Sequence, residues 1–539
     1  MRERKIGLIA VITVLLASAV FALGVDEEEI KSTQNETIVF INYTGPHSKI
    51  DSLASIKQLG TDLGIPVSKD ITSQSKFGNS KYSVIHAVDG SSKEKLDADI
   101  LVIGSYATVD HINNLRHIIA SYLVSAYGYS EKDAETVAVF VTVYNAVYRG
   151  KMDSFQKKYK DVVLNNLSQD KCGLSVNYEE WPGKSQIVIP LFDVKGGLST
   201  VDTSVISDTE VVKHMQEDDD KNVESRKEMV DIKEREAETA AKKAQEAQKT
   251  AVQEQKKLTE EKAKTETVKK EAETAKKEAE TAQKKAEENP KDQKLQKEAE
   301  EKKEAVKEAE KKVEEQKAEE EKQEQKTEEA KKEASEQQAV ADKKTSEAQE
   351  ERKTIAQDQA EVIKKEIENS TAPAAYGIEL TNESSMLSGL IKVNTKTGEV
   401  IKSSPVTVIR NRTMFQAGEN FIAIAGEKKG NGTIKLVLLS PDTMEIVKES
   451  NEVVAETSVL VQDNGEYYCV IENGNNYTLA KYDSDLNLKL KSDANLKSGT
   501  PVTVGSQYVI VTGSNGVVKV LNKSDLKEIS DSSGTANAK

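Results

Sequence analysis

Residues 284–300, KKAEENPKDQKLQKEAE, decide how the long middle of this chain is arranged. Pro290 is the only proline between residues 206 and 370, and that segment contains no glycine. Proline removes a backbone donor and disfavours helix at the preceding residue, so a helix is expected to stop near Asn289. The two arms have nearly equal lengths and would fit together as an antiparallel hairpin. The alternative is that Pro290 only starts a second helix, with at most a kink, in a straight segment of about 240 Å at 1.5 Å per residue.

Small apolar residues recur at intervals of three and four along both arms, with lapses at Glu254 and Glu261. In the first arm the positions are Ala237, Ala240, Ala244, Ala247, Ala251, Leu258, Thr265, Val268, Ala272, Ala275, Ala279, Ala282 and Ala286. In the second arm the positions at this spacing are Leu295, Ala299, Lys302, Val306, Ala309 and Val313, then Ala334, Ala341, Ala348, Ile355 and Val362. This spacing predicts long helices, and the intervening Glu and Lys residues add pairs worth roughly 0.2–0.5 kcal/mol each. Alanine seams bury little apolar area, so a solvated solitary spacer helix and a coiled coil both remain open.

The N-terminus has the pattern of an export signal. Arg2, Arg4 and Lys5 precede an uncharged run at residues 6–23, and Ala22 and Gly24 place small residues at a cleavage site. We therefore predict a signal peptide at residues 1–24. The apolar run is also just long enough to span a bilayer, so an uncleaved N-terminal anchor is the alternative. No cysteine lies near the site, which excludes a cysteine-linked lipid anchor.

Residues 25–205 combine short apolar runs with longer helical patterns. Strands are predicted at 38–41, 100–103 and 187–189, and helices at 109–127 and 131–149. The second helix is apolar nearly all round, with Ser130 as its cap, which suits a helix central to a core. These elements predict a mixed α/β or α+β domain.

Residues 371–539 contain an internal repeat. The segments beginning at Ile391, Val437, Ala480 and Val518 each join an apolar strand through a polar turn to a second strand, and further short strands lie between them. A four-strand unit recurring every 40 or so residues is typical of a propeller blade. Four units are few for a closed ring, and an irregular β-meander or sandwich is the alternative. We expect an all-β repeat domain that is propeller-like. The chain is thus multidomain, with residues 206–370 as the long charged helical or coiled-coil segment.

Composition and motifs exclude several classes of function. The chain carries a net charge of −15 without an unopposed basic stripe, which argues against nucleic acid. Five histidines, at positions 47, 86, 111, 117 and 214, show no metal-binding spacing, and no phosphate loop or nucleophile elbow occurs. The turn at Gly183-Lys184-Ser185 precedes a strand instead of opening a helix. We therefore predict no catalytic, cofactor-binding or metal-ligating residues, no cofactor, and a protein that is not an enzyme.

The two cysteines, Cys172 and Cys469, lie in different predicted domains. They are expected to be separate thiols. If the hairpin forms, however, the two globular ends meet, and a disulfide between them becomes conceivable in an oxidising compartment.

Five motifs occur in an order that resembles a known family. They are NYTGP at 42–46, IGS at 103–105, LR at 115–116, YNAVYRG at 144–150 and WPGKSQI at 181–187. Together they are similar to the spirochaete eighty-three/one-hundred-kilodalton antigen family, a Borrelia-type immunodominant envelope antigen with a signal sequence, a Glu/Lys-rich middle and a β-rich C-terminal part. The resemblance implies an envelope antigen of the periplasm or cell envelope without established enzymatic activity, and it transfers no functional residues.

Three hypotheses follow for function. The preferred one is a structural or tethering protein in which the long helical segment sets a distance between envelope components. The second is a binding module that captures a ligand or protein partner on the loops of the β domain, and the third is an enzyme hidden in the first domain. The sequence does not identify the partner, which would be a protein or another envelope component, or the oligomeric state.

Overall fold

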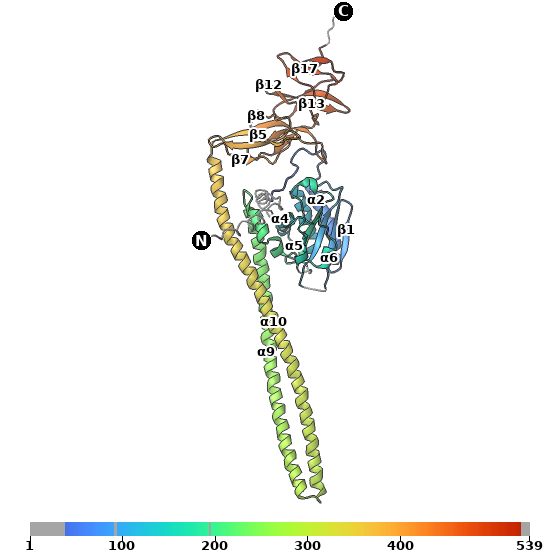
Figure 1. The fold of residues 1–539 in the computed structure, drawn as a ribbon, viewed down its shortest axis with the longest axis vertical. Coiled ribbons are helices and arrows are strands. Elements are labelled where there is room, and N and C mark those ends of the chain that lie inside the picture. Colours follow the sequence, from blue (N-terminus) through green and yellow to red (C-terminus); the bar gives the residue numbers. More distant parts are fainter. Residues whose placement is uncertain (1–37, 91–93, 193, 195, 530–539) are drawn as a thin grey trace, which may run out of the picture.

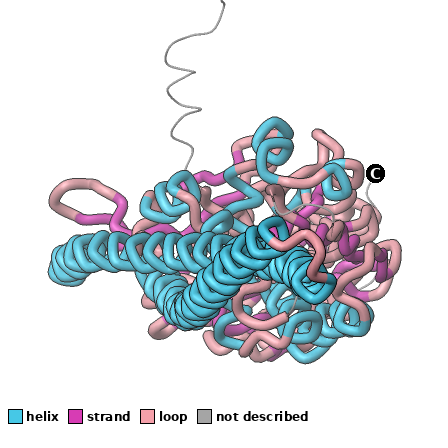
Figure 2. The backbone as a smooth tube through the Cα atoms, turned by 90° about the horizontal axis from the view of Figure 1, so that it is seen from below, coloured by secondary structure: helices cyan, strands magenta, loops and turns pink. Residues whose placement is uncertain are grey.

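The computed structural model describes residues 38–90, 94–192, 194 and 196–529, so the predicted leader at 1–24 lies outside the described residues. Figure 1 shows two globular domains at one end and a long pair of helices that projects away from them. In Figure 2, which looks from below, this pair is the part of the molecule nearest the viewer. Within the described part of the chain, no helix has both the length and the apolar composition needed to cross a bilayer.

The N-terminal domain is built on a four-stranded antiparallel sheet in the order β1-β2-β3-β4. The strands are β1 (Ser75–Gly78), β2 (Tyr82–Ala87), β3 (Asp97–Ile103) and β4 (Ser185–Leu191). The strands predicted at 100–103 and 187–189 lie within β3 and β4. The strand predicted at 38–41 is wrong, because Ile41 forms only an isolated bridge to Asn177 and is 52% exposed.

Two core helices, α3 (Ile112–Tyr127) and α4 (Glu131–Val147), confirm the helices predicted at 109–127 and 131–149. Helix α4 is buried on almost every side, as its apolar composition predicted. The side chain of Ser130 caps α4 by accepting a hydrogen bond from the backbone N–H of Asp133. Gly128 ends α3 in the left-handed region, at φ 74°. The domain therefore combines helices and strands as predicted, and because its sheet is antiparallel it is of the α+β class.

Helix α2 (Leu53–Lys69) lies against α3 and has no counterpart in the sequence prediction. The two helices approach so closely that a Cβ atom on Gly60 would lie 2.2 Å from the carbonyl oxygen of Ile118. A Cβ on Gly64 would lie 2.7 Å from that of Tyr122. The smaller helices of the domain are α5 (Met152–Lys158), α6 (Asp161–Leu164), η1 (Tyr178–Glu180), α7 (Thr203–Ile206) and α8 (Thr209–Gln216).

Helices α9 (Val223–Glu288) and α10 (Gln293–Thr371) form an antiparallel hairpin that turns around Pro290. Asp292 caps α10 by accepting hydrogen bonds from the backbone N–H groups of Lys294 and Leu295. The hairpin hypothesis is confirmed, and the solitary extended helix is wrong. At 1.5 Å per residue, the shorter helix is about 100 Å long.

The predicted heptad positions face the partner helix. Ala244, Ala251 and Leu258 in α9 are buried, as are Ala341 and Ala348 in α10. The remaining predicted positions of both arms are buried or half-buried. The first turns of α9 extend the N-terminal core beyond residue 205, because Met229 and Ile232 pack in it.

Within the described residues, the C-terminal domain consists of four antiparallel sheets. The first contains β5 (Ala374–Asn382), β6 (Leu387–Asn394) and β7 (Val400–Ser403), and the second contains β8 (Phe415–Ala417), β9 (Asn420–Ala425), β10 (Lys435–Leu439) and β11 (Ile446–Glu449). The third contains β12 (Val461–Asp463), β13 (Glu466–Asn473), β14 (Asn476–Tyr482) and β15 (Leu488–Lys491), and the fourth contains β16 (Thr503–Val504), β17 (Tyr508–Thr512) and β18 (Val518–Asn522). The all-β prediction is confirmed.

These sheets stack one after another without closing into a ring. One apolar cluster joins the first sheet to the second, another joins the second to the third, and a last one joins the third to the fourth. Among the described residues, no strand pairing or apolar cluster joins the first sheet to the fourth. The structure thus has blade-like sheets in an open stack, not a closed propeller, and the last sheet lies at the end remote from the hairpin (Figure 1).

Candidate functional site: the helical hairpin and its base

Two polar layers set the register of the hairpin, and both lie where the heptad pattern lapses. Gln323 donates a hydrogen bond from Nε2 to Glu254 Oε2 at 2.6 Å, and Thr327 donates from Oγ1 to the backbone carbonyl of Glu254 at 3.2 Å. One heptad further along, Gln316 donates from Nε2 to Glu261 Oε2 at 2.5 Å. A shift of either helix would separate these partners inside an otherwise apolar seam, so the layers specify one alignment.

The outer faces of the hairpin carry closely mixed charges. Ion pairs join the helices at Lys262–Glu324, 3.2 Å, and at Lys302–Glu278, 2.7 Å. All four side chains are about half exposed, and exposed pairs contribute roughly 0.2–1 kcal/mol each. The rod is therefore held mainly by its seam.

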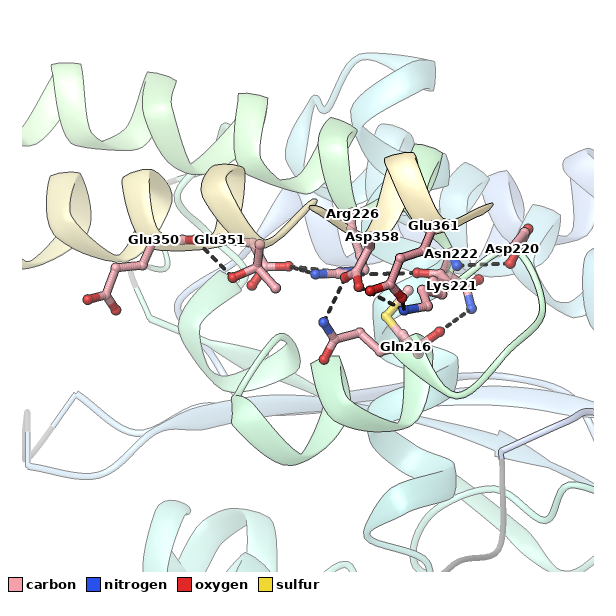
Figure 3. A network of polar contacts seen from close by, with 11 residues as sticks. Gln216, Asp220, Lys221, Asn222, Arg226, Glu350, Glu351, Asp358 and Glu361 are labelled. Carbon is pink, nitrogen blue, oxygen red and sulfur yellow. Dashed lines mark hydrogen bonds and ion pairs between the residues drawn. The ribbon is translucent and has the colours of Figure 1, made fainter. Parts of the chain in front are cut away.

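The base of the hairpin is joined to the N-terminal domain by a buried ionic network, shown in Figure 3. Arg226 of α9 has no exposed surface. Its Nη1 lies 2.6 Å from Asp358 Oδ2, and its Nε donates to Glu351 Oε1 at 2.8 Å. Asp358 also accepts hydrogen bonds from Gln216 of α8, at 2.8 Å, and Lys221, at 3.0 Å. Three helices, α8, α9 and α10, thus meet at one arginine.

The charge state of Asp358 follows from these contacts. Burial alone would raise the pKa of its carboxyl, but hydrogen bonds from Arg226, Gln216 and Lys221 outweigh it and hold the pKa below its ordinary value. The carboxylate therefore stays charged at neutral and mildly acidic pH, and the network remains intact there.

A second set of contacts fixes the first turns of the rod. Arg235 of α9 pairs with Asp133 of α4 at 2.5 Å. Glu236 accepts hydrogen bonds from Lys344 of α10 at 2.6 Å and from Thr203 of α7 at 2.9 Å. These contacts add polar links to the apolar packing of α9 in the core. The hairpin is a continuation of the N-terminal domain and not a flexible appendage.

The segment at 42–48 joins the two globular domains. The ring of Tyr43 packs in the core between the first two sheets of the β domain, and its hydroxyl donates to the carbonyl of Pro46 at 2.9 Å. His47 Nε2 lies 3.0 Å from Asp110 Oδ2, and Ser48 donates to the carbonyl of Asn431 at 2.9 Å. The hydrogen bond with Asp110 raises the pKa of His47, and burial raises that of Tyr43 to about 12. The first motif of the predicted resemblance is thus an interdomain contact.

The other motif residues have structural positions in the N-terminal domain. Asn145 satisfies the edge of β4, because its Oδ1 accepts from the backbone N–H of Val188 and its Nδ2 donates to the carbonyl of Val188, both at 2.8 Å. Trp181 is fully buried and donates from Nε1 to the carbonyl of Ser175 at 2.7 Å. Gly183 adopts φ +74°, and its backbone N–H donates to the carbonyl of Ile103. The Gly183-Lys184-Ser185 segment is therefore a turn into β4.

The sequence did not predict a buried ionisable cluster at the centre of the N-terminal domain. His86 Nδ1 lies 2.5 Å from Asp99 Oδ1, and Asp99 Oδ2 accepts hydrogen bonds from the hydroxyls of Tyr122, at 2.6 Å, and Tyr127, at 2.5 Å. His86 and Asp99 have no exposed surface, and the other imidazole nitrogen faces the carbonyl of Ile71 at 3.1 Å. A substrate has no route to these groups. Their pairing follows from the strand register, in which His86 of β2 lies opposite Asp99 of β3, and the sequence alone does not show that these strands are neighbours.

Two further histidines, His111 and His214, also make local structural contacts. His111 caps α3 by accepting a hydrogen bond from the backbone N–H of Asn113. His214 Nδ1 lies 3.1 Å from Glu217 Oε2 in a partly buried pair. In the described part of the chain, no group of three or more His, Cys, Asp or Glu side chains is placed to hold a metal ion.

The two thiols are far from pairing. Cys172 is buried in the core of the N-terminal domain, and Cys469 is buried between the second and third β sheets. Both are free, although the hairpin does bring the two domains together. The disulfide that the sequence made conceivable is therefore not formed, because each cysteine side chain is buried in the core of its own domain. Burial raises the pKa of both thiols.

Comparison with known families gives a match over most of the chain. The family model described as Borrelia P83/100 protein matches residues 27–502, which include the N-terminal domain, the hairpin and most of the β domain. The expected resemblance to the spirochaete antigen family is thus confirmed. No curated protein matches the chain.

Proposed function

The chain belongs to the Borrelia P83/100 protein family, and from this premise we propose that it is a non-catalytic, exported envelope protein with a structural role. Its hairpin is a spacer that holds the tip around Pro290 roughly 80 Å from a head made of the two globular domains, because the part of α9 beyond Glu236 projects from the head at 1.5 Å per residue. The helices therefore set the distance between the head and the tip. In the simplest tethering layout, a long helix would instead separate the two globular domains, but in this structure the two domains are neighbours.

The observation that carries this proposal is the buried network at Arg226. A spacer transmits a fixed distance only if its base cannot pivot. Arg226, Asp358 and Gln216 tie both hairpin helices to α8, while Met229 and Ile232 anchor α9 in the domain core. The polar layers at Glu254 and Glu261 support the same role, because they prevent the helices from sliding.

The absence of catalysis is part of the proposal and has its own support. The hydrogen-bonded pair of His86 and Asp99 is sealed within the core. The charged side chains at the hairpin base are paired with one another in contacts between helices. The alternative function, capture of a ligand at the mouth of a closed β ring, has less support because the four sheets form an open stack.

Shortening the rod tests the spacer role. Residues 265–278 and 301–314 face each other in the register set by Gln316 and Gln323, and deleting both segments removes two heptads from each helix. The rod should shorten by about 21 Å at 1.5 Å per residue, while both polar layers survive. Small-angle X-ray scattering should show this shortening with no change in the unfolding of the head.

The cellular readout is photo-crosslinking in the spirochaete from a photoreactive residue at Lys291, in the tip, and from another at Lys396, in the head. If the rod is a spacer, the shortened chain loses the tip crosslinks and keeps those of the head. A matched control exchanges Glu and Lys on the outer faces of the same heptads at full length and should keep both sets. Tip crosslinks that survive the shortening would refute the spacer role.

A further inference from the structure

A cavity of about 890 Å³ lies at the base of the hairpin, where the N-terminal domain meets the two long helices. One wall is formed by residues 199–216, which include α7 and most of α8. The other wall is formed by Lys233 and Glu236 of α9 and by residues 340–354 of α10. This volume is within the range of cavities that hold small-molecule ligands, and the spacer role does not explain it.

Lys233 is a buried cation without a partner in this cavity. The residue is only 9% exposed, and among the described residues its ammonium group forms no hydrogen bond or ion pair. Burial lowers the pKa of the amine, and attraction by nearby carboxylates only partly offsets this effect. Its Nζ retains accessible surface, unlike the sealed Oε1 of Glu236, and therefore opens into the cavity. Since an ammonium group needs acceptors for its three N–H bonds, the contents of the cavity must supply them.

Two carboxylates of α10 line the same cavity. Glu347 and Glu351 lie one turn apart, and they exert the strongest attraction on the ammonium group of Lys233. Each forms its ion pair with another residue, since Glu351 Oε1 lies 2.8 Å from Arg226 Nη2 and Glu347 Oε1 lies 3.8 Å from Lys343 Nζ. Both carboxylate side chains remain accessible, at 18% and 36% exposure, so they can accept further hydrogen bonds. Opposite charges thus face the cavity without being paired to each other.

The cavity also has an apolar part. Phe192 is 61% exposed and Val340 is 39% exposed, and both side chains line the cavity. Val205 of α7 and Val212 of α8 line it as well. Exposed apolar side chains beside a cavity favour a ligand that covers them.

We propose that this cavity binds a small zwitterion with an apolar side chain, either a free amino acid such as leucine or a short peptide with free ends. The carboxylate of the ligand accepts hydrogen bonds from Lys233 Nζ, and its ammonium group donates to Glu347 and Glu351. Its side chain covers Phe192 and Val340. The inference goes beyond the spacer role, because it gives the base of the hairpin a ligand.

The signs of the charges in the cavity favour a zwitterion over a simple ion. An anion bound at Lys233 would be repelled by the carboxylates of Glu347 and Glu351, which line the same cavity. A cation bound at these carboxylates would be repelled by Lys233 and would leave its ammonium group without an acceptor. Only a molecule that carries both charges compensates both sides of the cavity.

Calorimetric titration of residues 25–539, which contain every described residue, tests the binding. Leucine or leucyl-leucine, each added up to about 10 mM, should bind saturably with one molecule per chain. Tighter binding of the dipeptide assigns the site to peptides, and tighter binding of leucine assigns it to free amino acids; both results support the proposal. Isocaproate and isoamylamine lack the ammonium group and the carboxylate of leucine, respectively, and should bind at least tenfold more weakly than the tighter zwitterion. Binding of neither zwitterion overturns the proposal, and so does equally tight binding of isocaproate, because an anion alone would then suffice.

Two matched lysine variants locate the site. Lys233→Met removes the unpartnered ammonium group and should weaken binding of the tighter zwitterion at least tenfold. Because no ion pair is lost, the unfolding midpoint of the head should not fall. Lys343→Met changes another lysine of the same cavity, but that side chain is 72% exposed, so the affinity should change by less than about threefold. Equal losses of affinity in the two variants contradict the proposed site.

Protection from acetylation tests the same site in the unaltered protein. Acetic anhydride should acetylate Lys233 through the cavity, and a saturating concentration of the tighter zwitterion should slow this reaction at least tenfold. Acetylation of Lys343 should continue at a nearly unchanged rate, and mass spectrometry of the digested chain measures both. Equal protection of the two lysines, or no protection of Lys233, overturns the proposal. So does a Lys233 that fails to react in the free chain, because its amine would then not open into the cavity.

Discussion

Replacing Arg226 by methionine should loosen the base of the hairpin. Methionine retains much of the length of the side chain but leaves Glu351 and Asp358 without their shared cation. Breaking a buried pair from one side typically costs 3–5 kcal/mol. The two carboxylates here are 18% and 10% exposed, and Asp358 keeps Lys221 and Gln216, so we expect a smaller loss of about 2–3 kcal/mol.

Native-state hydrogen exchange measures this loss where it occurs. Amides of α10 between residues 348 and 362 exchange through opening of the base, so their exchange should accelerate about 30- to 150-fold, since every 1.4 kcal/mol is tenfold. Amides near the tip should be unaffected. In the double variant Arg226→Met with Asp358→Leu, much of the loss should be recovered, because fewer buried charges remain unpaired.

Arg352→Met is the matched control. Arg352 also joins α10 to α9, through Asp231 at 2.7 Å and Glu234 at 2.8 Å, but its side chain is 47% exposed. Its loss should cost less than about 1 kcal/mol. If Arg352→Met accelerates exchange as much as Arg226→Met, burial is not what makes the network strong, and the reasoning fails.

Three further predictions concern the head. Gly60→Ala should lower the stability of the N-terminal domain by about 1–3 kcal/mol, because the added methyl group would clash with the backbone of α3. Urea unfolding followed by the fluorescence of the single tryptophan should show a lower midpoint. An unchanged midpoint would contradict the close approach of the two helices. Asn145→Leu should cost a similar amount by leaving the Val188 N–H unpaired in the core, in the same assay, whereas Asn145→Asp should retain part of the stability by still accepting from that N–H. The pKa of His47 is raised by the hydrogen bond with Asp110, so its contribution to stability is complete below about pH 6.5 and is lost as the pH rises through the folded value. Protection factors of amides at the domain junction, which are corrected for the intrinsic exchange rate at each pH, should be higher at pH 6 than at pH 8, and this difference should vanish in His47→Gln.

The hairpin could be predicted from the sequence because its rules are local. Alanines at heptad spacing predicted the seam, and Pro290 predicted the turn. What could not be derived was the choice between a hairpin and a straight helix. That choice depends on long-range pairs such as Gln323 with Glu254, and these pairs become visible only when the two arms are aligned.

The N-terminal domain was predicted less completely, for physical reasons. Helix α2 contains Gly60, Gly64 and Pro66, which lower helix propensity, and tertiary packing against α3 overrides them. The apolar run at 38–41 resembles a strand in composition but finds no neighbouring strand with which to form a ladder. The pairing of His86 with Asp99 requires knowing that β2 and β3 are neighbours.

In the β domain, the repeat predicted the strands but not their arrangement in space. Each repeated hairpin specifies its own sheet through local turns. Whether a series of such sheets closes depends on the angle between successive sheets, and no single repeat encodes that angle. The open stack therefore appears only in the structure.

The extension of the N-terminal core into α9 determines which fragments of this antigen can serve as immunogens. A recombinant piece that ends at residue 205 lacks Met229 and Ile232, so antibodies raised against it would recognise apolar surfaces that the intact chain hides. A piece of the rod behaves differently, because the contacts described between residues 254 and 327 join α9 to α10 alone. Serum antibodies that bind such a rod fragment should therefore also bind the whole protein, whereas those selected on the truncated domain should not.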